Sequence, residues 1–262
     1  VGVAWAMESF ERGLISGLET EGVDLRFGNS AAMLAMVEQI GLRRGFGRLL
    51  GEGVRRAASA LGGGSEYWAM HVKGLELPGY EPRSLKTLAL GLAVGTRGAC
   101  HNRSAGYEVD MSAKVDRLTA ERSRGSLEVA QEDYAATLDS LGICKFIRRC
   151  FDAFHVEAAD LFRAATGLEL SAEELQRAGE RVCNLKKAFN IREGWVRADD
   201  TLPPRLLEEK LPTGVAKGTG LSREELDLMI DGYYEARGWT RDGLIPPSRL
   251  AELGLDDLGL ES

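Results

Sequence analysis

Residues 171–189 read SAEELQRAGERVCNLKKAF, and residues 222–238 read SREELDLMIDGYYEARG. Each stretch begins with a serine that is followed three residues later by a glutamate, the arrangement of a capping box. The serine hydroxyl accepts a hydrogen bond from a free backbone N–H, and the glutamate carboxylate accepts one from the serine N–H. The sequence therefore predicts helices over Leu175–Phe189 and Leu226–Ala236, and the second helix is expected to stop at Gly238.

Further helices are predicted upstream of these two from apolar residues at helical spacing. They are expected over Val1–Arg12, from Asn29 or Ser30 onward, and over Arg48–Leu61, Leu127–Leu138 and Val156–Ala165. The second of them is expected to carry Met33, Leu34, Met36, Val37 and Ile40 on one face.

Strand signals are poor, and the one candidate strand is Met70–Leu77, which Pro78 closes. Long loops are expected over about 62–87, 95–112 and 190–220. The fold class is therefore mainly α. A charged, small-residue stretch near Arg117–Ser126 predicts a boundary between two helical lobes, 1–120 and 121–262.

Composition narrows the function classes further. The 262 residues include 33 Lys and Arg against 40 Asp and Glu, a net charge of -7. This acidic balance argues against a broad nucleic-acid-binding face and against an anionic membrane surface as partner. The chain has no apolar run of the roughly 18 residues that would span a bilayer. Four cysteines without a close pair favour a reducing compartment, so we expect a cytoplasmic protein. Because the chain begins with Val1 inside an apolar helical pattern, we expect it to be part of a longer protein.

The three histidines are scattered, and each taken alone is more typical of a structural role than of a metal ligand. His101 is the best exception, because it follows Cys100 in a glycine-punctuated segment with Arg97 and Arg103. Small residues let the backbone approach a ligand closely, and the cations can donate to an anion or an oxygen-rich ring. The alternative is a turn whose arginines are solvated.

A second candidate is the segment DSLGICK, residues 139–145. Gly142 predicts a turn after the preceding helix, and this turn presents Cys144 at the start of the next one. The helix N-terminus and the neighbouring Lys145 both favour the thiolate form, which suits a metal ligand or a nucleophile. A buried and inert cysteine is the alternative.

Together these segments make the family recognisable. Six segments occur in the order that is typical of the family. They are HVKGLELPGYEPR (71–83), RGACH (97–101), DSLGICK (139–145), FNIREG (189–194), DTLP (200–203) and the stretch from 231 to Trp239. Over essentially its whole length the chain resembles the tungsten- or molybdenum-pterin aldehyde ferredoxin oxidoreductases.

The resemblance implies an N-terminal β-rich domain that is missing here, and two helical domains that close over the cofactor. It implies a metal held by the sulfurs of two pterins, a [4Fe–4S] cluster and a ferredoxin-like electron acceptor. The implied reaction is the oxidation of a small aldehyde to a carboxylic acid. The family includes dimers, so the resemblance makes a homodimer plausible.

The family binds its pterins partly through two Asp-x-x-Gly-Leu-(Cys/Asp) motifs. The second copy resembles Asp139, Gly142, Ile143 and Cys144, with Lys145 following, and implies pterin binding there. The first copy corresponds to ETEGVD (19–24), in which Glu19 replaces the leading aspartate and Asp24 ends the motif. A carboxylate suits this role because pterin rings present N–H and amino donors.

The resemblance also assigns roles to individual residues. It makes Cys144 the fourth ligand of the cluster, and the other three cysteines of the family set are absent from this chain. It places His101 near the metal as a proton donor or acceptor, and Arg103 at the pterin edge or its phosphate. We therefore expect that this chain alone does not hold a stable cluster.

Two other functions stay open at this point. A related tungsten subunit of a dearomatising benzoyl-CoA reductase would share the scaffold but differ in chemistry. A helical subunit that binds a partner without a cofactor would account for the altered Glu19 motif and the missing cysteines. The retained motifs around His101, Asp139 and Cys144 favour the enzyme.

Overall fold

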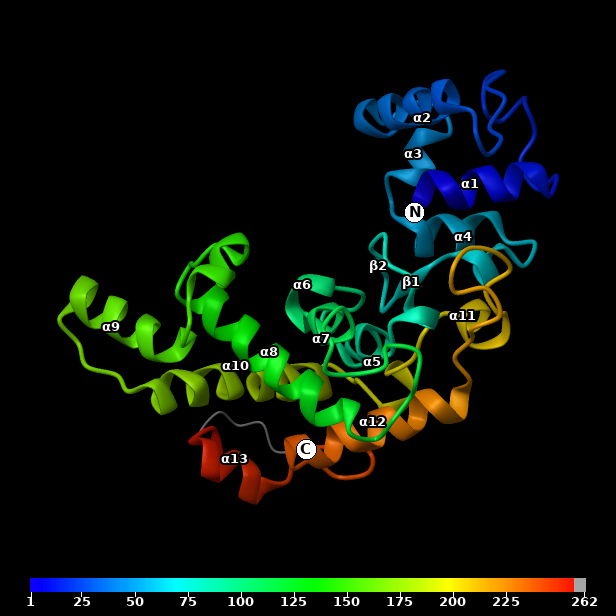
Figure 1. Ribbon diagram of the computed structural model, residues 1–262. Helices are drawn as coiled ribbons and strands as arrows, with labels where there is room; N and C mark the ends of the chain where they lie inside the picture. The colour runs from blue at the N-terminus through cyan, green and yellow to red at the C-terminus, as the bar shows by residue number, and fades with distance from the viewer. Residues whose placement is uncertain (257–262) are drawn as a thin grey trace.

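The computed structural model describes residues 1–256 and is shown in Figure 1. Its N-terminal part is a group of short helices that lies apart from the longer C-terminal helices in this view. These helices are α1 (Gly2–Glu11), α2 (Ser30–Leu42), α3 (Gly47–Leu50), α4 (Val54–Leu61) and η1 (Ser65–Trp68). Trp5, fully buried, donates its indole N–H to the Ser65 carbonyl oxygen at 3.0 Å, and so ties α1 to η1.

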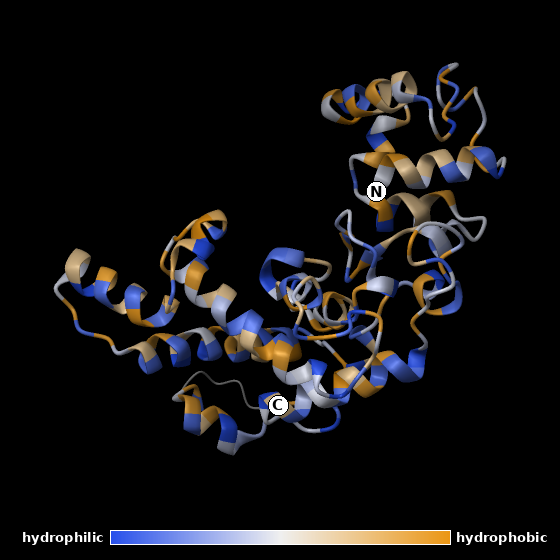
Figure 2. Ribbon diagram, viewed as in Figure 1, coloured by the Kyte–Doolittle hydropathy of each residue, from blue (hydrophilic) through white to orange (hydrophobic). Residues whose placement is uncertain are grey.

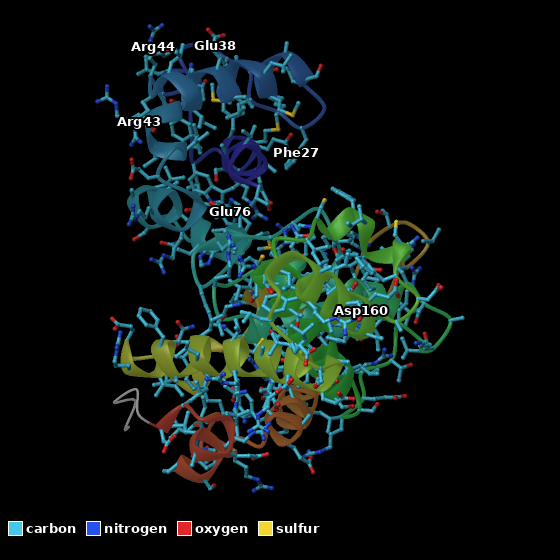
Figure 3. All side chains as sticks on the ribbon, turned by 90° about the vertical axis from the view of Figure 1, so that its left-hand side faces the viewer. Phe27, Glu38, Arg43, Arg44, Glu76 and Asp160 are labelled. Atoms are coloured by element: carbon cyan, nitrogen blue, oxygen red, sulfur yellow. The ribbon has the colours of Figure 1, made fainter. Side chains whose placement is uncertain are left out.

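The prediction of one helix over Arg48–Leu61 is wrong, because the segment breaks into α3 and α4. Gly53 has a φ of +87°, a value that ends a right-handed helix. The Val54 N–H at the start of α4 donates to the Glu76 carboxylate at 2.7 Å. In Figure 3, Glu76 lies where the N-terminal helices meet the rest of the chain.

The apolar residues that were predicted to share one face of α2 differ in burial. Met36 is fully buried, whereas Met33, Leu34 and Val37 are exposed. The hydrophobic residues of α2 are visible as orange segments in Figure 2. Helix α2 packs against α3 and α1 along a narrow stripe, so the rest of its apolar surface has no cover within residues 1–256.

A small hairpin joins this part to the centre of the molecule. Strands β1 (His71–Val72) and β2 (Leu75–Glu76) pair antiparallel, with His71 opposite Glu76. They fall inside the segment Met70–Leu77 that was expected as a strand. The sheet is shorter than expected because Lys73 and Gly74 form a tight turn with positive φ at both residues.

Helix α5 (Lys86–Val94) forms the centre of the molecule, and all its residues are buried. It packs against α7, α8 and α12. Short helices of three to five residues occur in the segments expected as long loops, so these segments are not fully irregular. These short helices are η2 (Pro82–Ser84), α6 (His101–Ser104), α7 (Gly106–Asp110), η4 (Arg197–Asp199) and α11 (Pro204–Glu208).

The C-terminal helices are longer, and both capping boxes are present as predicted. They are α8 (Arg124–Ser140), η3 (Lys145–Cys150), α9 (Phe154–Thr166), α10 (Ala172–Arg192), α12 (Arg223–Arg237) and α13 (Pro247–Leu253). Helix α8 packs along both α10 and α12. A Cβ atom on Gly125 of α8 would overlap the backbone of Gly232 in α12, so glycine allows this close crossing.

A buried ion-pair cluster fastens α12 to α8. The Arg237 guanidinium is fully buried and contacts Glu132 at 2.8 Å and Asp133 at 2.6 Å. Its Nε also donates to the Tyr233 hydroxyl at 3.2 Å. Removing one partner of such a buried pair leaves an uncompensated charge, which costs about 3–5 kcal/mol.

The prediction of a mainly helical fold is confirmed. One hydrophobic core lies between Trp5 and Ala69, and a second joins Val72–Ala99 to Leu202–Trp239. The lobe boundary near Arg117–Ser126 stays a prediction. The two hydrophobic cores are divided at another point of the sequence, between Ala69 and Val72. Along residues 1–256, no helix combines the length and apolar composition needed to cross a membrane.

Candidate functional site

The segment that carries His101 begins directly after α5, and the surrounding chain holds it at three points. Lys73 Nζ donates to the Ala93 carbonyl at 2.6 Å and to the Gly95 carbonyl at 3.2 Å. The Asn190 amide donates to the Thr96 carbonyl at 2.6 Å. Gly98 has a φ of +94°, and a Cβ atom there would overlap the Val72 carbonyl oxygen, so the segment lies directly on β1.

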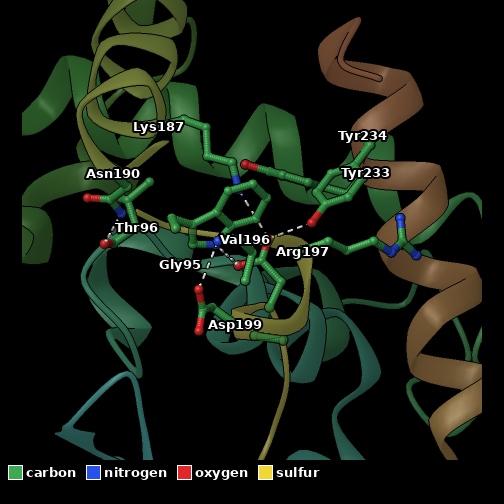
Figure 4. Close-up of polar contacts among 12 residues, drawn as sticks. Gly95, Thr96, Lys187, Asn190, Val196, Arg197, Asp199, Tyr233 and Tyr234 are labelled. Atoms are coloured by element: carbon green, nitrogen blue, oxygen red, sulfur yellow. Dashed lines mark hydrogen bonds and ion pairs between the residues drawn. The ribbon is translucent and has the colours of Figure 1, made fainter. Parts of the chain in front are cut away.

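A buried carboxylate lies beside this segment, and Figure 4 shows its surroundings, with Gly95, Thr96, Lys187, Asn190 and Tyr234 labelled. Asp200 accepts hydrogen bonds from Lys73 Nζ at 2.8 Å, Lys187 Nζ at 3.2 Å, the Tyr234 hydroxyl at 2.7 Å and the Trp195 indole N–H at 3.0 Å. Burial lowers the pKa of Lys187 to about 7, against the opposing attraction of Asp200. Asp200 belongs to the DTLP segment, but no sequence signal marks this cluster, because its members are spread over residues 73 to 234.

His101 lies in a pocket of about 610 Å³, named here the His101 pocket. It is formed by α6, the end of α8 and the start of η3. Its lining residues are Tyr80, Arg97, Cys100, His101, Asn102, Arg103, Tyr107, Asp139, Cys144, Lys145, Phe146 and Arg148. Six residues proposed from the sequence therefore come together here, namely Arg97, His101, Arg103, Asp139, Cys144 and Lys145.

Two tyrosines lie beside the His101 ring, and neither was predicted from the sequence as a site residue. The ring centroid of His101 lies 5.4 Å from that of Tyr80 and 6.0 Å from that of Tyr107. Burial, and then the nearby Lys145 ammonium, lowers the pKa of His101 below its usual value. The imidazole is therefore neutral at neutral pH and can accept a proton. Burial and the Glu108 carboxylate raise the pKa of Tyr107 to about 12.

Two contacts connect α6 to the turn after α8. Arg103 Nε contacts Asp139 Oδ2 at 2.8 Å, and both side chains are about half exposed. Lys145 Nζ donates to the Asn102 carbonyl oxygen and lies 5.6 Å from the centroid of the Tyr107 ring. Burial, and then Arg148, lowers the pKa of Lys145. These contacts bring together segments that are separated by about 40 residues in the sequence.

The turn itself has the predicted shape. Gly142 has a φ of +67°, and the Ile143 N–H donates to the Leu138 carbonyl at 3.0 Å. Cys144 precedes η3, and its thiol is free and exposed. The helix that follows Cys144 is present and is a short 3₁₀ helix.

The other two proposed residues lie elsewhere. Glu19 and Asp24 belong to the loop between α1 and α2, which lies at the outer end of α1, away from α6 in Figure 1. The Glu19 carboxylate accepts hydrogen bonds from the N–H of Ser16 at 2.7 Å and from its hydroxyl at 3.0 Å. These bonds lower the pKa of Glu19. Asp24 pairs with Arg26 at 3.0 Å.

The described residues do not form a metal site of their own. Within residues 1–256, no group of three or more His, Cys, Asp and Glu side chains is placed to hold a metal ion. Cys183 is buried, and burial raises the pKa of its thiol, so it does not offer a thiolate. The thiols that line the His101 pocket are Cys100 and Cys144.

Comparison with known proteins identifies relatives over nearly the whole chain. Tungsten-containing aldehyde ferredoxin oxidoreductases of Pyrococcus abyssi and Pyrococcus furiosus are each 36% identical to it, over 97% of this chain. A WOR-like subunit of an aliphatic sulfonate oxidoreductase of Pyrococcus furiosus is 28% identical, also over 97% of this chain. The chain spans 42% of the length of the first two proteins and 39% of the third.

A solved structure shares the fold. The active-site complex BamBC of benzoyl coenzyme A reductase, in complex with 1,5-dienoyl-CoA, superposes with a TM-score of 0.75 at 22% identity. The superposition covers 98% of this chain and 43% of that one. At this identity the likeness supports the fold alone. The family described as aldehyde ferredoxin oxidoreductase, domains 2 and 3, matches residues 1–255, and the chain therefore belongs to the aldehyde ferredoxin oxidoreductase family.

Proposed function

We propose that this chain forms the helical, cofactor-covering part of an enzyme that oxidises an aldehyde to a carboxylic acid. In the complete protein, a tungsten–pterin group would lie against the His101 pocket, and electrons would leave through a [4Fe–4S] cluster to a ferredoxin-like acceptor. The relatives named as tungsten-containing aldehyde ferredoxin oxidoreductases support this reading. The main structural support for the proposal is that His101, Arg103 and Asp139 line one pocket.

The residues of the pocket fit a pterin. The Asp139 carboxylate is half exposed at the pocket and held in place by Arg103, so it can also accept hydrogen bonds from ring N–H and amino groups. Arg103 keeps further N–H donors for the ring edge or its phosphate. Gly142 and Ile143 shape the turn that presents Asp139, and Lys145 adds a positive charge beside it. Glu19 and Asp24 would contact the second pterin from the other motif loop.

The pocket offers two thiols, and one of them fits the role of a single cluster ligand. Cys144 is exposed beside Asp139, whereas a [4Fe–4S] cluster takes about four thiolates. We propose that Cys144 supplies one ligand and that the part of the enzyme outside this chain supplies the others. Reconstitution of the purified chain is then expected to give well below about four irons per chain. Full loading without another polypeptide would contradict this.

His101 is placed to move a proton. When bound, the tungsten–pterin group would take up the two electrons of the oxidation, and water would supply the oxygen. The neutral imidazole, with its lowered pKa, can accept the proton that leaves as water adds to the aldehyde carbon. Tyr80 and Tyr107 hold the ring in position and limit its access to water.

The complete protein with His101→Ala tests this function. We expect aldehyde-dependent dye reduction to fall on the order of 100-fold, while tungsten and iron contents stay those of the wild type. His155→Gln is the matched control, because His155 is also half-buried with a burial-lowered pKa but lies in α9, outside the pocket. Unchanged turnover in His101→Ala would remove His101 from the mechanism. Wild-type protein without tungsten would refute the proposed cofactor.

A further inference from the structure

The side chain of Glu128 in α8 is fully buried and does not line the His101 pocket. Among the residues that the structure describes, neither oxygen of its carboxyl group has a hydrogen-bond partner. Burial of an ionised carboxylate costs a large free energy unless a partner compensates the charge. The surroundings of Glu128 therefore decide which charge state the fold can hold.

Three helices meet at this carboxyl group, because α8 packs against α5, α6 and α7. A Cβ atom added to Gly91 of α5 would overlap Glu128 Oε1, and one added to Gly106 of α7 would overlap Glu128 Oε2. The carboxyl group therefore lies directly against the backbone of two helices, in space that only glycine leaves free.

The charged groups that face Glu128 favour a neutral acid. Burial, and then the carboxylates of Glu132 in α8 and Asp110 in α7, raise the pKa of Glu128 well above its usual value. The opposing cations are Arg237 of α12 and Lys145 of η3. Both have other partners, since Arg237 pairs with Glu132 at 2.8 Å and Lys145 donates to a carbonyl oxygen of α6. The other two neighbouring helices, α5 and α6, present Gly91 and a serine to the carboxyl group.

That serine, Ser104, is the last residue of α6, the helix that begins with His101. The Ser104 hydroxyl is also buried and, within residues 1–256, also has no hydrogen-bond partner. The Cβ atom that would overlap Glu128 Oε1 from Gly91 would overlap Ser104 Cβ as well, so the two side chains are neighbours. Ala105 follows with a φ of +55°, a value that a residue with a side chain adopts only where its surroundings impose it.

We propose that Glu128 carries a proton at neutral pH and that its O–H group is the hydrogen-bond donor that the Ser104 hydroxyl lacks. Glu128 is then a positioning residue, because it fixes the end of α6 and thereby the place of His101 beside Tyr80 and Tyr107. The effect of Glu128 on the His101 ring is a property of this chain. Its effect on turnover rests on the proposed function.

Infrared spectroscopy of the purified 262-residue chain tests the charge of Glu128. A protonated carboxyl group has a C=O stretching band that ionised carboxylates do not have. At neutral pH, Glu128→Gln is expected to lose intensity in this band relative to the wild type. Glu173→Gln is the matched control and is expected to keep it, because Glu173 is an exposed glutamate in the first turn of α10. An unchanged band in Glu128→Gln would overturn the proposal.

Urea unfolding at several pH values tests the same proton by its effect on stability. Above about pH 4.3 a glutamate in the unfolded chain is ionised, whereas Glu128 in the folded chain keeps its proton, so unfolding releases one proton. Stability is then lost as the pH rises from there to the folded pKa. In that window the unfolding equilibrium constant of the wild type, divided by that of Glu128→Gln, is expected to rise about tenfold per pH unit. A ratio that does not change with pH would overturn the proposal.

Proton NMR of the histidine rings tests the positioning of α6. The ring signals of His101 depend on the two tyrosine rings beside it, so they shift when α6 moves. Glu128→Leu, which has no donor, is expected to shift these signals, whereas Glu128→Gln, whose amide can donate, is expected to keep them. Ser104→Ala removes the acceptor and is expected to shift them too, and His155 in α9 is the internal control. If neither Glu128→Leu nor Ser104→Ala shifts the His101 signals, Glu128 does not position α6.

Steady-state kinetics of the complete enzyme test the consequence for turnover. Glu128→Leu is expected to lower kcat for an aldehyde about tenfold at an unchanged KM and tungsten content, and Glu128→Gln is expected to restore most of kcat. A glutamine variant as slow as the leucine variant would overturn the role of the donor. If the enzyme oxidises no aldehyde while the His101 signals of the chain still distinguish the two variants, the proposed function is refuted and the role of Glu128 remains.

Discussion

The turn at Asp139–Cys144 and the loop at Glu19–Asp24 carry the same sequence pattern, but the chain holds their acidic residues differently. The motif glycines, Gly142 and Gly22, both have positive φ, +67° and +84°. The leading acids differ. Asp139 pairs with Arg103 of another helix, whereas Glu19 accepts hydrogen bonds from Ser16 of its own loop. The motif specifies a similar backbone turn in both copies. The long-range contact between Asp139 and Arg103 makes only the second copy part of a pocket.

This difference predicts unequal effects on the cofactor of the complete protein. Asp139→Ala removes a carboxylate that is oriented by Arg103, and we expect tungsten–pterin retention to fall about 10–100-fold, the range for a lost hydrogen bond to a charged group. Glu19→Ala is expected to have a smaller effect, because the Glu19 oxygens are already partly engaged by Ser16. Metal analysis after dialysis measures both.

A third exposed carboxylate serves as the control for this pair. Glu169 lies between α9 and α10, outside both motif loops, and Glu169→Ala is expected to retain the cofactor like the wild type. A greater loss of tungsten in Glu19→Ala than in Asp139→Ala would reverse the ranking and assign the main contact to the N-terminal loop.

The similarity of the two turns predicts equal costs in stability. Gly142→Ala and Gly22→Ala meet no atom within 4 Å of the added Cβ, so the cost is backbone strain alone. We expect each variant to lose about 1 kcal/mol of unfolding free energy, measured with urea on the purified chain. Gly17→Ala, in the same loop as Gly22 but without positive φ and with open space, is expected to cost little or to stabilise. A Gly17→Ala cost as large as the other two would exclude strain as the cause.

The features that the sequence predicted correctly are those set by neighbouring residues. Both capping boxes, the stop at Gly238 and the turn at Gly142 follow from residues within one helical turn of each other. The break at Gly53 was missed because it depends on Glu76, which accepts the Val54 N–H from 22 residues away. Periodicity places apolar residues on one face of α2, but it does not say how much of that face the neighbouring helices cover.

The site followed the same rule. His101, Asp139 and Cys144 were proposed from local motifs, and the structure brings them into one pocket. Tyr80 beside the imidazole, and the Asp200 cluster that holds the segment before it, depend on contacts between distant parts of the chain. No local spacing marks such contacts.

The electrostatic link between the two halves of the His101 pocket gives a finer test. Lys145 belongs to the Asp139 turn and lowers the pKa of His101 on α6, although burial is the larger cause. Lys145→Met is therefore expected to raise the pKa of His101, which stays below its usual value because the ring remains buried. A proton NMR titration of the chain follows the ring signals of all three histidines, and His155 serves as the internal control. Lys114→Met, which removes an exposed lysine outside the pocket, is expected to leave His101 unchanged.

The same shift has a consequence for stability. Because the pKa of His101 is lower in the folded chain, the unfolded chain binds more protons as the pH falls below about 6.5. Stability is therefore lost over that window, down to the folded pKa, and Lys145→Met should lessen the loss. Glu19→Ala should change neither the His101 titration nor this pH dependence, because its loop makes no contact with the pocket. A shift of His101 in Glu19→Ala would mean that the two motif loops are coupled through the fold.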